Sequence, residues 1–260
     1  MDMNSRGPRT AVVTGASSGI GRATALRLHE EGYRVLAIAR RRERLEDLAR
    51  MVNDPEKFDV LPCDVSVDED VARVADYVER EFGGVLTSLC NIAGGALGIE
   101  QVADAAFDKW EGMFRSNVIG SGRVTKALLP ALEASGHGDV VFLTSTASQA
   151  AYEGGSGYNA AKAGEHMIAA ALRLELAGKP IRVIEIAPGL VHTEEFSLTR
   201  LGGDQAAADK VYEGVEKPLT ADDVADVIAY SVKLPHHVNL DLVTLRPLAQ
   251  AAQHKLIRSA

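Results

Sequence analysis

Tyr158 and Lys162 stand four residues apart at the start of an Ala-rich amphipathic stretch, and Ser145 precedes the tyrosine by thirteen residues. On a helix, positions i and i+4 lie on one face, so the phenol and the ammonium can point into the same cleft. A free tyrosine has a pKa of about 10, but a fixed cation nearby favours the phenolate. The pattern therefore indicates a tyrosine that exchanges protons near neutral pH, provided that other parts of the chain complete a site. By itself the spacing is common on helices.

A glycine-rich turn, Thr14 to Gly21, follows the apolar run 10–13 and leads directly into a helical pattern. Glycines permit tight turning and close backbone approach, and the helix N-terminus offers free N–H groups and a positive dipole to a pyrophosphate. The position between a strand and a helix favours a dinucleotide site over a chance glycine pattern. The expected contacts are Gly15, Ser17, Ser18, Gly19, Ile20 and Gly21.

Arginines replace the acidic residue that NAD-binding proteins carry at the end of the second strand. An Asp or Glu there accepts hydrogen bonds from the adenosine ribose, whereas this chain has Arg40 and Arg41 after the run 34–39. Guanidinium groups suit bidentate phosphate binding. The alternative is a basic, solvated turn that opens the next helix. We favour NADP as the cofactor.

Apolar runs rich in β-branched residues alternate with helix-period segments along the whole chain. Strands are expected at 10–13, 34–39, 59–61, 86–91, 139–144, 181–186 and 242–245, and helices near 20–31, 42–52, 68–82, 107–134, 156–178 and 221–233. Such alternation predicts parallel strands with crossover helices in a doubly wound α/β sheet. We expect one domain over residues 1–260, with an irregular segment at about 189–220 that covers a ligand.

Composition narrows the class of protein. The 260 residues include 46% hydrophobic residues and carry a formal net charge of -8, which argues against nucleic-acid or anionic-membrane partners because these require a basic face. The N-terminus lacks an apolar stretch long enough for a signal peptide, so we expect a cytoplasmic protein. Cys63 and Cys90 end apolar runs and indicate buried, reduced thiols. The seven histidines lack ligand spacing, so no metal site is expected.

These motifs together resemble the short-chain dehydrogenase/reductase family. The resemblance covers nearly the whole chain and rests on the glycine turn, the Asn91 to Gly94 element, Asn117, Ser145, Tyr158, Lys162 and Pro188 with Gly189. It implies a Rossmann domain whose seven-stranded parallel sheet has the order 3-2-1-4-5-6-7, with helices on both faces. Where the family usually has a second asparagine, this chain has Ile92, which leaves local hydrogen bonding in doubt more than catalysis.

The resemblance implies a role for each residue of a catalytic tetrad. Tyr158 would be the general acid in carbonyl reduction and the base in alcohol oxidation. Lys162 would bind the nicotinamide ribose and lower the tyrosine pKa, Ser145 would bind the substrate oxygen, and Asn117 would position a water in a proton relay. The implied cofactor contacts, besides the glycine turn and the two arginines, are Asp64, Val65, Asn91, Ala93, Gly94, Tyr158, Lys162, Pro188, Gly189, Val191 and Thr193.

Three later stretches, 195–204, 218–226 and 234–241 followed by 246–250, are similar to the NADP-dependent 3-hydroxy acid dehydrogenases, which also oxidise serine and allo-threonine and are tetramers. A 3-hydroxy acid needs a cation for its carboxylate. Arg200 is our candidate within the covering segment, and Arg246 is the second choice. A ketone or aldehyde reductase for a larger neutral substrate remains an alternative, as does, less favoured, a catalytically silent NADP-binding sensor. The apolar faces of 107–134 and of the helix after Tyr158 indicate a homo-oligomer.

Overall fold

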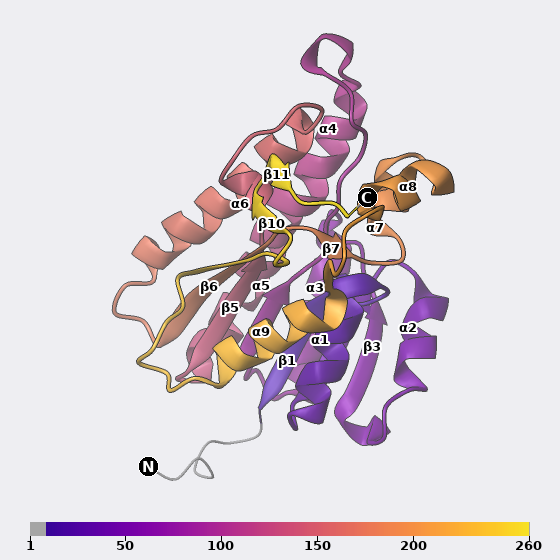
Figure 1. Ribbon diagram of the computed structural model, residues 1–260. Helices are drawn as coiled ribbons and strands as arrows, with labels where there is room; N and C mark the ends of the chain where they lie inside the picture. The colour runs from indigo at the N-terminus through magenta and orange to yellow at the C-terminus, as the bar shows by residue number, and fades with distance from the viewer. Residues whose placement is uncertain (1–8, 260) are drawn as a thin grey trace.

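A seven-stranded parallel sheet forms the centre of the molecule (Figure 1). The structure is a computed structural model that describes residues 9–259. The strands are β1 (Thr10–Thr14), β2 (Arg34–Ala39), β3 (Phe58–Pro62), β4 (Ser88–Asn91), β5 (Gly138–Leu143), β6 (Ile181–Pro188) and β9 (Leu242–Leu245). Their order is β3-β2-β1-β4-β5-β6-β9, and every neighbouring pair is parallel. The predicted order is therefore confirmed, with β9 as the seventh strand.

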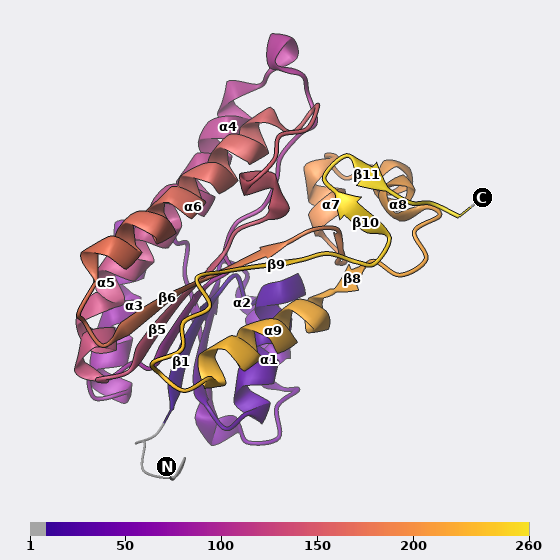
Figure 2. The same cartoon turned by 60° about the vertical axis from the view of Figure 1, so that its left-hand side comes forward.

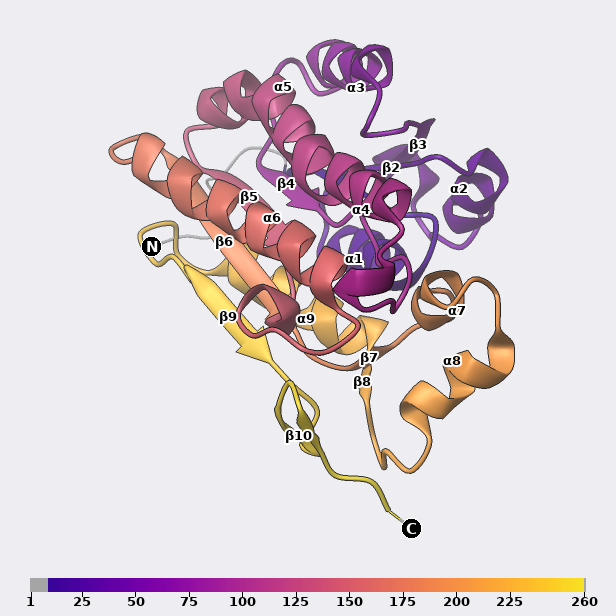
Figure 3. The ribbon, with the colours of Figure 1, turned by 90° about the horizontal axis from the view of Figure 1, so that it is seen from above.

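Helices cover both faces of this sheet (Figures 1 and 3). On one face, α1 (Gly19–Glu30), α2 (Arg42–Ala49) and α9 (Ala221–Lys233) contribute to one buried apolar cluster. On the other, α3 (Asp68–Glu81), α5 (Ser121–Ala134) and α6 (Ser156–Glu175) contribute to a second. The sheet separates two cores, so strands β1, β4 and β5 are buried along their full length, as the uniformly apolar runs predicted.

Local sequence explains where these helices begin and which face they bury. In α3, Val71, Val74 and Val78 recur at helical spacing and are buried, and three acidic residues in its first turn complement the helix dipole. At the start of α9, Thr220 and Asp223 bond reciprocally through side chains and backbone N–H groups as a capping box. Periodicity thus defines the buried faces, and capping fixes this N-terminus.

The stretch predicted as one helix over 107–134 is helical throughout but changes its winding. It consists of α4 (Phe107–Met113), the π-helical η4 (Phe114–Gly120) and α5. Single-turn π-helical stretches are uncommon and frequently mark functional sites. A side chain at Gly120 would lie only 2.7 Å from Val65 Cγ2, so the glycine allows the wide turn to pack against the loop after β3. Asn117 lies in this wide turn and is fully buried.

Several short elements lie beyond the carboxyl ends of the strands (Figure 2). The segment expected to be irregular contains β7 (Val191–His192), α7 (Phe196–Arg200), α8 (Gln205–Tyr212) and β8 (Leu219–Thr220). A hairpin of β10 (Gln250–Ala252) and β11 (Lys255–Leu256) follows β9, and the 3-10 turns η2 (Pro55–Lys57), η3 (Val102–Asp104) and η5 (Thr146–Ser148) complete the chain. None of the helices within residues 9–259 has the length and apolar character that a membrane crossing requires.

Candidate active site

A cavity of about 1040 Å³ opens at the carboxyl ends of the strands. This edge of a doubly wound sheet is where such folds bind ligands. The glycine turn, the loops after β3, β4 and β5, the start of α6 and the segment 189–220 all contribute to its walls. The cavity is lined by every residue predicted to contact cofactor or substrate except Asn91 and the second-choice Arg246, and by three of the four predicted catalytic residues: Ser145, Tyr158 and Lys162.

The glycine turn is held against the end of β4 by hydrogen bonds to the Thr14 side chain and by close backbone packing. Thr14 Oγ1 accepts hydrogen bonds from the N–H groups of Ile92 and Ala93, each at 2.8 Å. Gly15 has a positive φ of 69°, and a Cβ there would lie 2.9 Å from Ala93 Cα. A Cβ on Gly21 would lie 2.3 Å from the carbonyl oxygen of Gly15. Both positions therefore require glycine, and the close packing presents the N-terminus of α1 to the cavity.

Ile92, which stands where the resembling family usually has an asparagine, has its backbone N–H paired and its side chain in an apolar cluster. Its N–H is satisfied by Thr14, and its side chain is 9% exposed and belongs to an apolar cluster. The preceding Asn91 donates from Nδ2 to Thr125 Oγ1 at 2.9 Å, which ties β4 to α5. The polar link across this part of the sheet therefore comes from Asn91, whose side chain does not line the cavity.

Arg41 connects two distant parts of the chain at the mouth of the cavity. Its guanidinium donates to Ser17 Oγ and Ser18 Oγ in the glycine turn, and to both carboxylate oxygens of Glu195 at 2.8 and 2.7 Å. The bonded guanidinium holds the pKa of Glu195 below its ordinary value. Arg40 lines the same region with an exposed side chain. Asp64 accepts bonds from the backbone and hydroxyl of Ser66.

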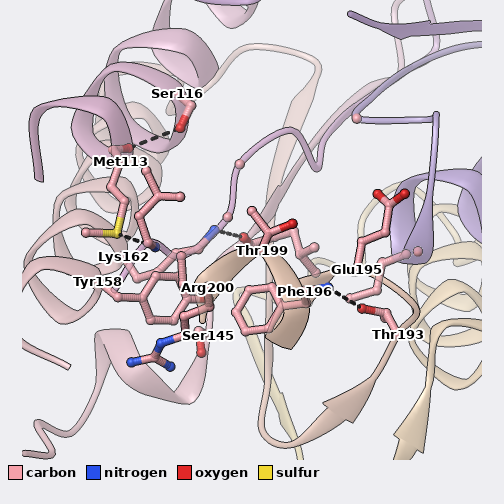
Figure 4. Close-up of a pocket in the computed structure, with 18 of the residues that line it drawn as sticks. Met113, Ser116, Ser145, Tyr158, Lys162, Thr193, Glu195, Phe196, Thr199 and Arg200 are labelled. Carbon is pink, nitrogen blue, oxygen red and sulfur yellow. Dashed lines mark hydrogen bonds between the residues drawn. The ribbon is translucent and has the colours of Figure 1, made fainter. Parts of the chain in front are cut away.

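Ser145 and Tyr158 both line the cavity. Ser145 caps η5 and accepts a hydrogen bond from the N–H of Ala147 at 3.1 Å. Tyr158 projects from the first turns of α6 and is 8% exposed. Its ring meets that of Phe196 edge-on, with 5.9 Å between the centroids. Figure 4 shows Phe196 and Arg200 of the covering segment beside Tyr158. The phenol therefore lies under that segment.

Lys162 is anchored by two acceptors within the protein. Its Nζ donates to the carbonyl oxygen of Leu143 at 2.8 Å and to Glu165 Oε2 at 2.7 Å, and the residue is only 4% exposed. Burial opposes the charged form, but the negative charge of Glu165 and the Tyr158 side chain outweigh it, so the pKa of Lys162 is raised. An ammonium has three N–H donors, so one remains for a ligand in the cavity.

Asn117 lies next to the cavity and not in its wall. Its side chain donates to the carbonyls of Met113 and Gly95 and accepts from the N–H of Gly95. The backbone carbonyl oxygen of Asn117 accepts a hydrogen bond from Ser121 Oγ at 2.7 Å. The amide therefore clamps the loop after β4, and a part in a proton relay stays a prediction.

Backbone carbonyls from two loops hold Arg200 beside Tyr158, the predicted catalytic tyrosine. Nε donates to Gly98 O at 3.2 Å and Nη2 to Gly154 O at 3.3 Å. The guanidinium carbon lies 5.4 Å from the centroid of the Tyr152 ring and 5.7 Å from that of Tyr158, within cation–π range. Arg246, the second candidate, is not among the lining residues. The structure thus brings only the first arginine to the predicted active tyrosine.

Other lining residues were not singled out from the sequence: Tyr152, Glu195, Phe196, Tyr212, Gln250 and Gln253. Gln250 Oε1 accepts from the N–H of Leu190 at 2.8 Å, and Gln253 Oε1 accepts from Thr146 Oγ1 at 2.7 Å. These bonds draw the C-terminal hairpin onto the site. A second tyrosine six residues before Tyr158 was a visible signal, whereas nothing local in the sequence marks the two glutamines.

Possible metal ligands do not gather around this cavity. Within residues 9–259, His, Cys, Asp and Glu side chains form no group of three that could hold an ion. Cys63 and Cys90 are free and buried, and burial raises the pKa of the Cys63 thiol to about 12.

Comparisons with known proteins agree with this geometry. A family model described as short chain dehydrogenase matches residues 9–200. An uncharacterized oxidoreductase of Mycobacterium tuberculosis is 48% identical over 94% of this chain and 93% of its own length. Sulfoacetaldehyde reductase 2 of Chromohalobacter salexigens is 39% identical over 92% and 94%. Serine 3-dehydrogenase of Agrobacterium fabrum is 38% identical over 93% and 95%.

A solved structure shares the whole architecture. The closed form of a serine dehydrogenase complexed with NADP+ superposes with a TM-score of 0.89 and 32% identity, covering 96% of this chain and all of that one. The similarity to serine dehydrogenases was predicted from the stretches 195–204, 218–226 and 234–241 followed by 246–250.

Proposed function

Because the chain belongs to the short chain dehydrogenase family, we propose that it is an NADP(H)-dependent oxidoreductase that interconverts a small anionic alcohol, most specifically a 3-hydroxy acid, and its carbonyl form. The observation that carries this proposal is the position of Arg200 beside Tyr158, at 5.7 Å from the ring centroid. A cation held there can bind the acid group while the hydroxyl meets the tyrosine.

The residues present fit an NADP molecule. The glycine turn leaves the N-terminus of α1 accessible for a pyrophosphate, and Arg40 and Arg41 can receive the 2′-phosphate at the same end. A cavity of about 1040 Å³ lies at the top of the range of small-molecule sites, so it has room for a dinucleotide with a small substrate. When bound, NADP supplies the hydride acceptor or donor.

Three side chains of the protein would handle the substrate oxygen and its proton. In oxidation, Tyr158 takes the hydroxyl proton, and in reduction it returns a proton to the carbonyl oxygen. Ser145 donates a hydrogen bond to the same oxygen. The remaining N–H of Lys162 binds the ribose, while the positive charge stabilises the phenolate.

Arg200 and the named relatives support a carboxylate or a sulfonate as the anionic group of the substrate. Two backbone carbonyls occupy two of the five N–H donors of Arg200, which leaves donors for a carboxylate or a sulfonate. Serine carries a carboxylate and sulfoacetaldehyde carries a sulfonate, and the relatives named for acting on them cover over nine-tenths of the chain. Both names support an anion-binding cleft.

Turnover with a substrate panel tests the proposal. Absorbance of the reduced nicotinamide is followed with NADP or NAD and serine, allo-threonine, 3-hydroxypropionate, 3-hydroxyisobutyrate, 2-hydroxyethanesulfonate or neutral alcohols. We expect NADP-dependent oxidation of at least one anion, with kcat reduced about 10²–10⁴-fold in Tyr158→Phe. Activity with neutral alcohols or ketones alone would establish the neutral-carbonyl reductase instead. NADPH binding without any turnover would favour a sensor.

Paired arginine variants test how the anion is recognised. Arg200→Ala should raise KM for the anionic substrate about 10–100-fold, because a hydrogen bond to a charged group contributes about 1.5–3 kcal/mol. The KM for any neutral substrate should stay unchanged. Arg246→Ala is the matched control and should leave KM unchanged. The reverse pattern would assign the anion to Arg246.

We also propose a homo-oligomer that uses the face formed by η4 and α6. Phe114, Ile119 and Met167 are exposed there by 39%, 51% and 58%, and exposed apolar groups of this kind mark interaction surfaces. Light scattering after size exclusion would give the assembly mass, and Ile119→Arg with Met167→Arg should lower it. A cytoplasmic location stays a prediction.

A further inference from the structure

A buried carboxylate, that of Glu165, lies next to Lys162 on α6. Tyr158, Lys162 and Glu165 are spaced by four and three residues, so they share one helix face. That face turns toward the sheet, where Glu165 is 1% exposed. An acidic side chain is almost never buried so completely without a partner, and here the partner is the ammonium of Lys162 at 2.7 Å.

A further ionisable pair adjoins this one. Glu185 on β6 is also 1% exposed and accepts from Thr144 Oγ1 at 2.7 Å. Both of its carboxylate oxygens lie within 2.9 Å of His166 Nδ1, and the His166 side chain is 27% exposed. Glu165 therefore faces Lys162 on its own helix and Glu185 on the sheet, and Lys162 in turn faces Tyr158. His166 connects the group to solvent.

We propose that Glu165 is a positioning residue that acts on Tyr158 through Lys162: its carboxylate anchors the ammonium and offsets part of the positive charge that stabilises the tyrosine phenolate. This inference rests on the proposed role of Tyr158 as acid and base. A residue outside the predicted tetrad thereby controls the pKa of Tyr158.

Electrostatics gives the carboxylate two states within the working pH range. Burial raises the pKa of Glu165 to about 7, although Lys162 opposes the shift, and Glu185 adds to it. An ionised Glu165 forms a close dipole with Lys162, whose field at the phenol is weaker than that of an isolated cation. A neutral Glu165 leaves the cation uncompensated, so the phenolate is then more strongly stabilised.

Glu165→Gln separates charge from shape, because the amide is nearly isosteric and still accepts a bond from Lys162. The phenolate of Tyr158 is titrated by ultraviolet difference absorbance in the protein without cofactor, and Tyr158→Phe identifies its signal. We expect the phenolate to form about one pH unit lower in Glu165→Gln, which is a tenfold change in proton affinity. The acidic limb of kcat/KM for oxidation, where activity rises as Tyr158 loses its proton, should move in the same direction.

A structural role alone would lower activity without moving either midpoint, and a midpoint shifted to higher pH would mean that Lys162 lost its charge. Either result would overturn the proposal. Glu175→Gln, on an exposed residue at the end of α6, is the matched control and should leave both midpoints unchanged. If Glu165→Gln does not fold, Glu165→Asp gives a second test, with a smaller shift of the same sign. Since the titration needs no substrate, its result is independent of whether the proposed reaction is correct.

Discussion

The two ends of the cavity are built by different means. At the glycine turn, backbone atoms approach closely, since a Cβ on Gly15 would lie 2.9 Å from Ala93 Cα and one on Gly21 would lie 2.3 Å from Gly15 O. At the other end, side chains from separate segments meet, among them Tyr152, Arg200 and Gln253. The first end is fixed by the sheet. The second depends on the identity of each side chain, so we expect substrate preference to be determined there.

The largest effect is expected at Gly21, which packs against the backbone of Thr14 and Gly15. In Gly21→Ala, the new Cβ would lie 2.3 Å from Gly15 O and 3.0 Å from Thr14 O, and neither atom can move without shifting β1. We expect a loss of about 2–4 kcal/mol in the free energy of unfolding and no measurable NADPH binding. Urea denaturation and fluorescence titration would measure the two. Gly95→Ala, with nothing within 4 Å of its Cβ, should keep the wild-type stability, and equal losses in both variants would contradict the distinction.

The second-largest effect is expected at Glu165, the buried carboxylate beside Lys162. The pKa of Glu165 is raised from an ordinary 4.5 to about 7 by burial, so the folded protein binds this proton more tightly than the unfolded chain. The resulting stabilisation is complete below pH 4.5 and is lost as the pH rises through 7. Relative to Glu165→Gln, the wild type should lose on the order of 3 kcal/mol over that window.

Urea denaturation at pH 4.5, 6 and 8 would measure this difference. A constant difference between wild type and Glu165→Gln across the three values would show that the carboxyl group does not titrate in this window.

A smaller effect is expected in the side-chain end. Tyr152→Leu removes the ring that lies 5.4 Å from the guanidinium carbon of Arg200, and a partly desolvated cation–π contact contributes about 1–2 kcal/mol. We expect KM for the anionic substrate to rise about 5–30-fold in steady-state kinetics, with NADPH binding unchanged. Tyr152→Phe keeps the ring and serves as the control. An increase of KM in the control would assign the effect to the hydroxyl group.

The smallest effect is expected at the ion pair that joins the two ends. Glu195 and Arg41 are partly exposed, so their pairing contributes less than about 1 kcal/mol. In Glu195→Gln, Arg41 is freed for a 2′-phosphate, and NADPH should bind about 2–5-fold more tightly in fluorescence titrations at low salt. NADH, which lacks that phosphate, provides the comparison. Equal changes for both nucleotides would mean that the pair controls access and not phosphate binding.

Sequence was most informative where local pattern and chain order specify the structure. Apolar runs that alternate with helical patterns predicted the doubly wound sheet, and the glycine turn predicted the cofactor end of the cavity. The strand order and the remaining cofactor contacts came from the resemblance to the family. The side-chain end depends on tertiary contacts, so Gln253 gave no local signal because its partner, Thr146, is more than a hundred residues away. Glu165 was missed for a related reason: its spacing places it on the Tyr158 face, but only the packing of α6 on the sheet shows that it is buried.

The hairpin of β10 and β11 is a part of the site that does not belong to the main sheet. It reaches the site through two glutamine side chains, Gln250 and Gln253, and within residues 9–259 its strands pair with each other and not with the main sheet. Its sequence can therefore change without altering the register of the main sheet. We expect this hairpin to vary more than the sheet does among enzymes that share one cofactor-binding framework.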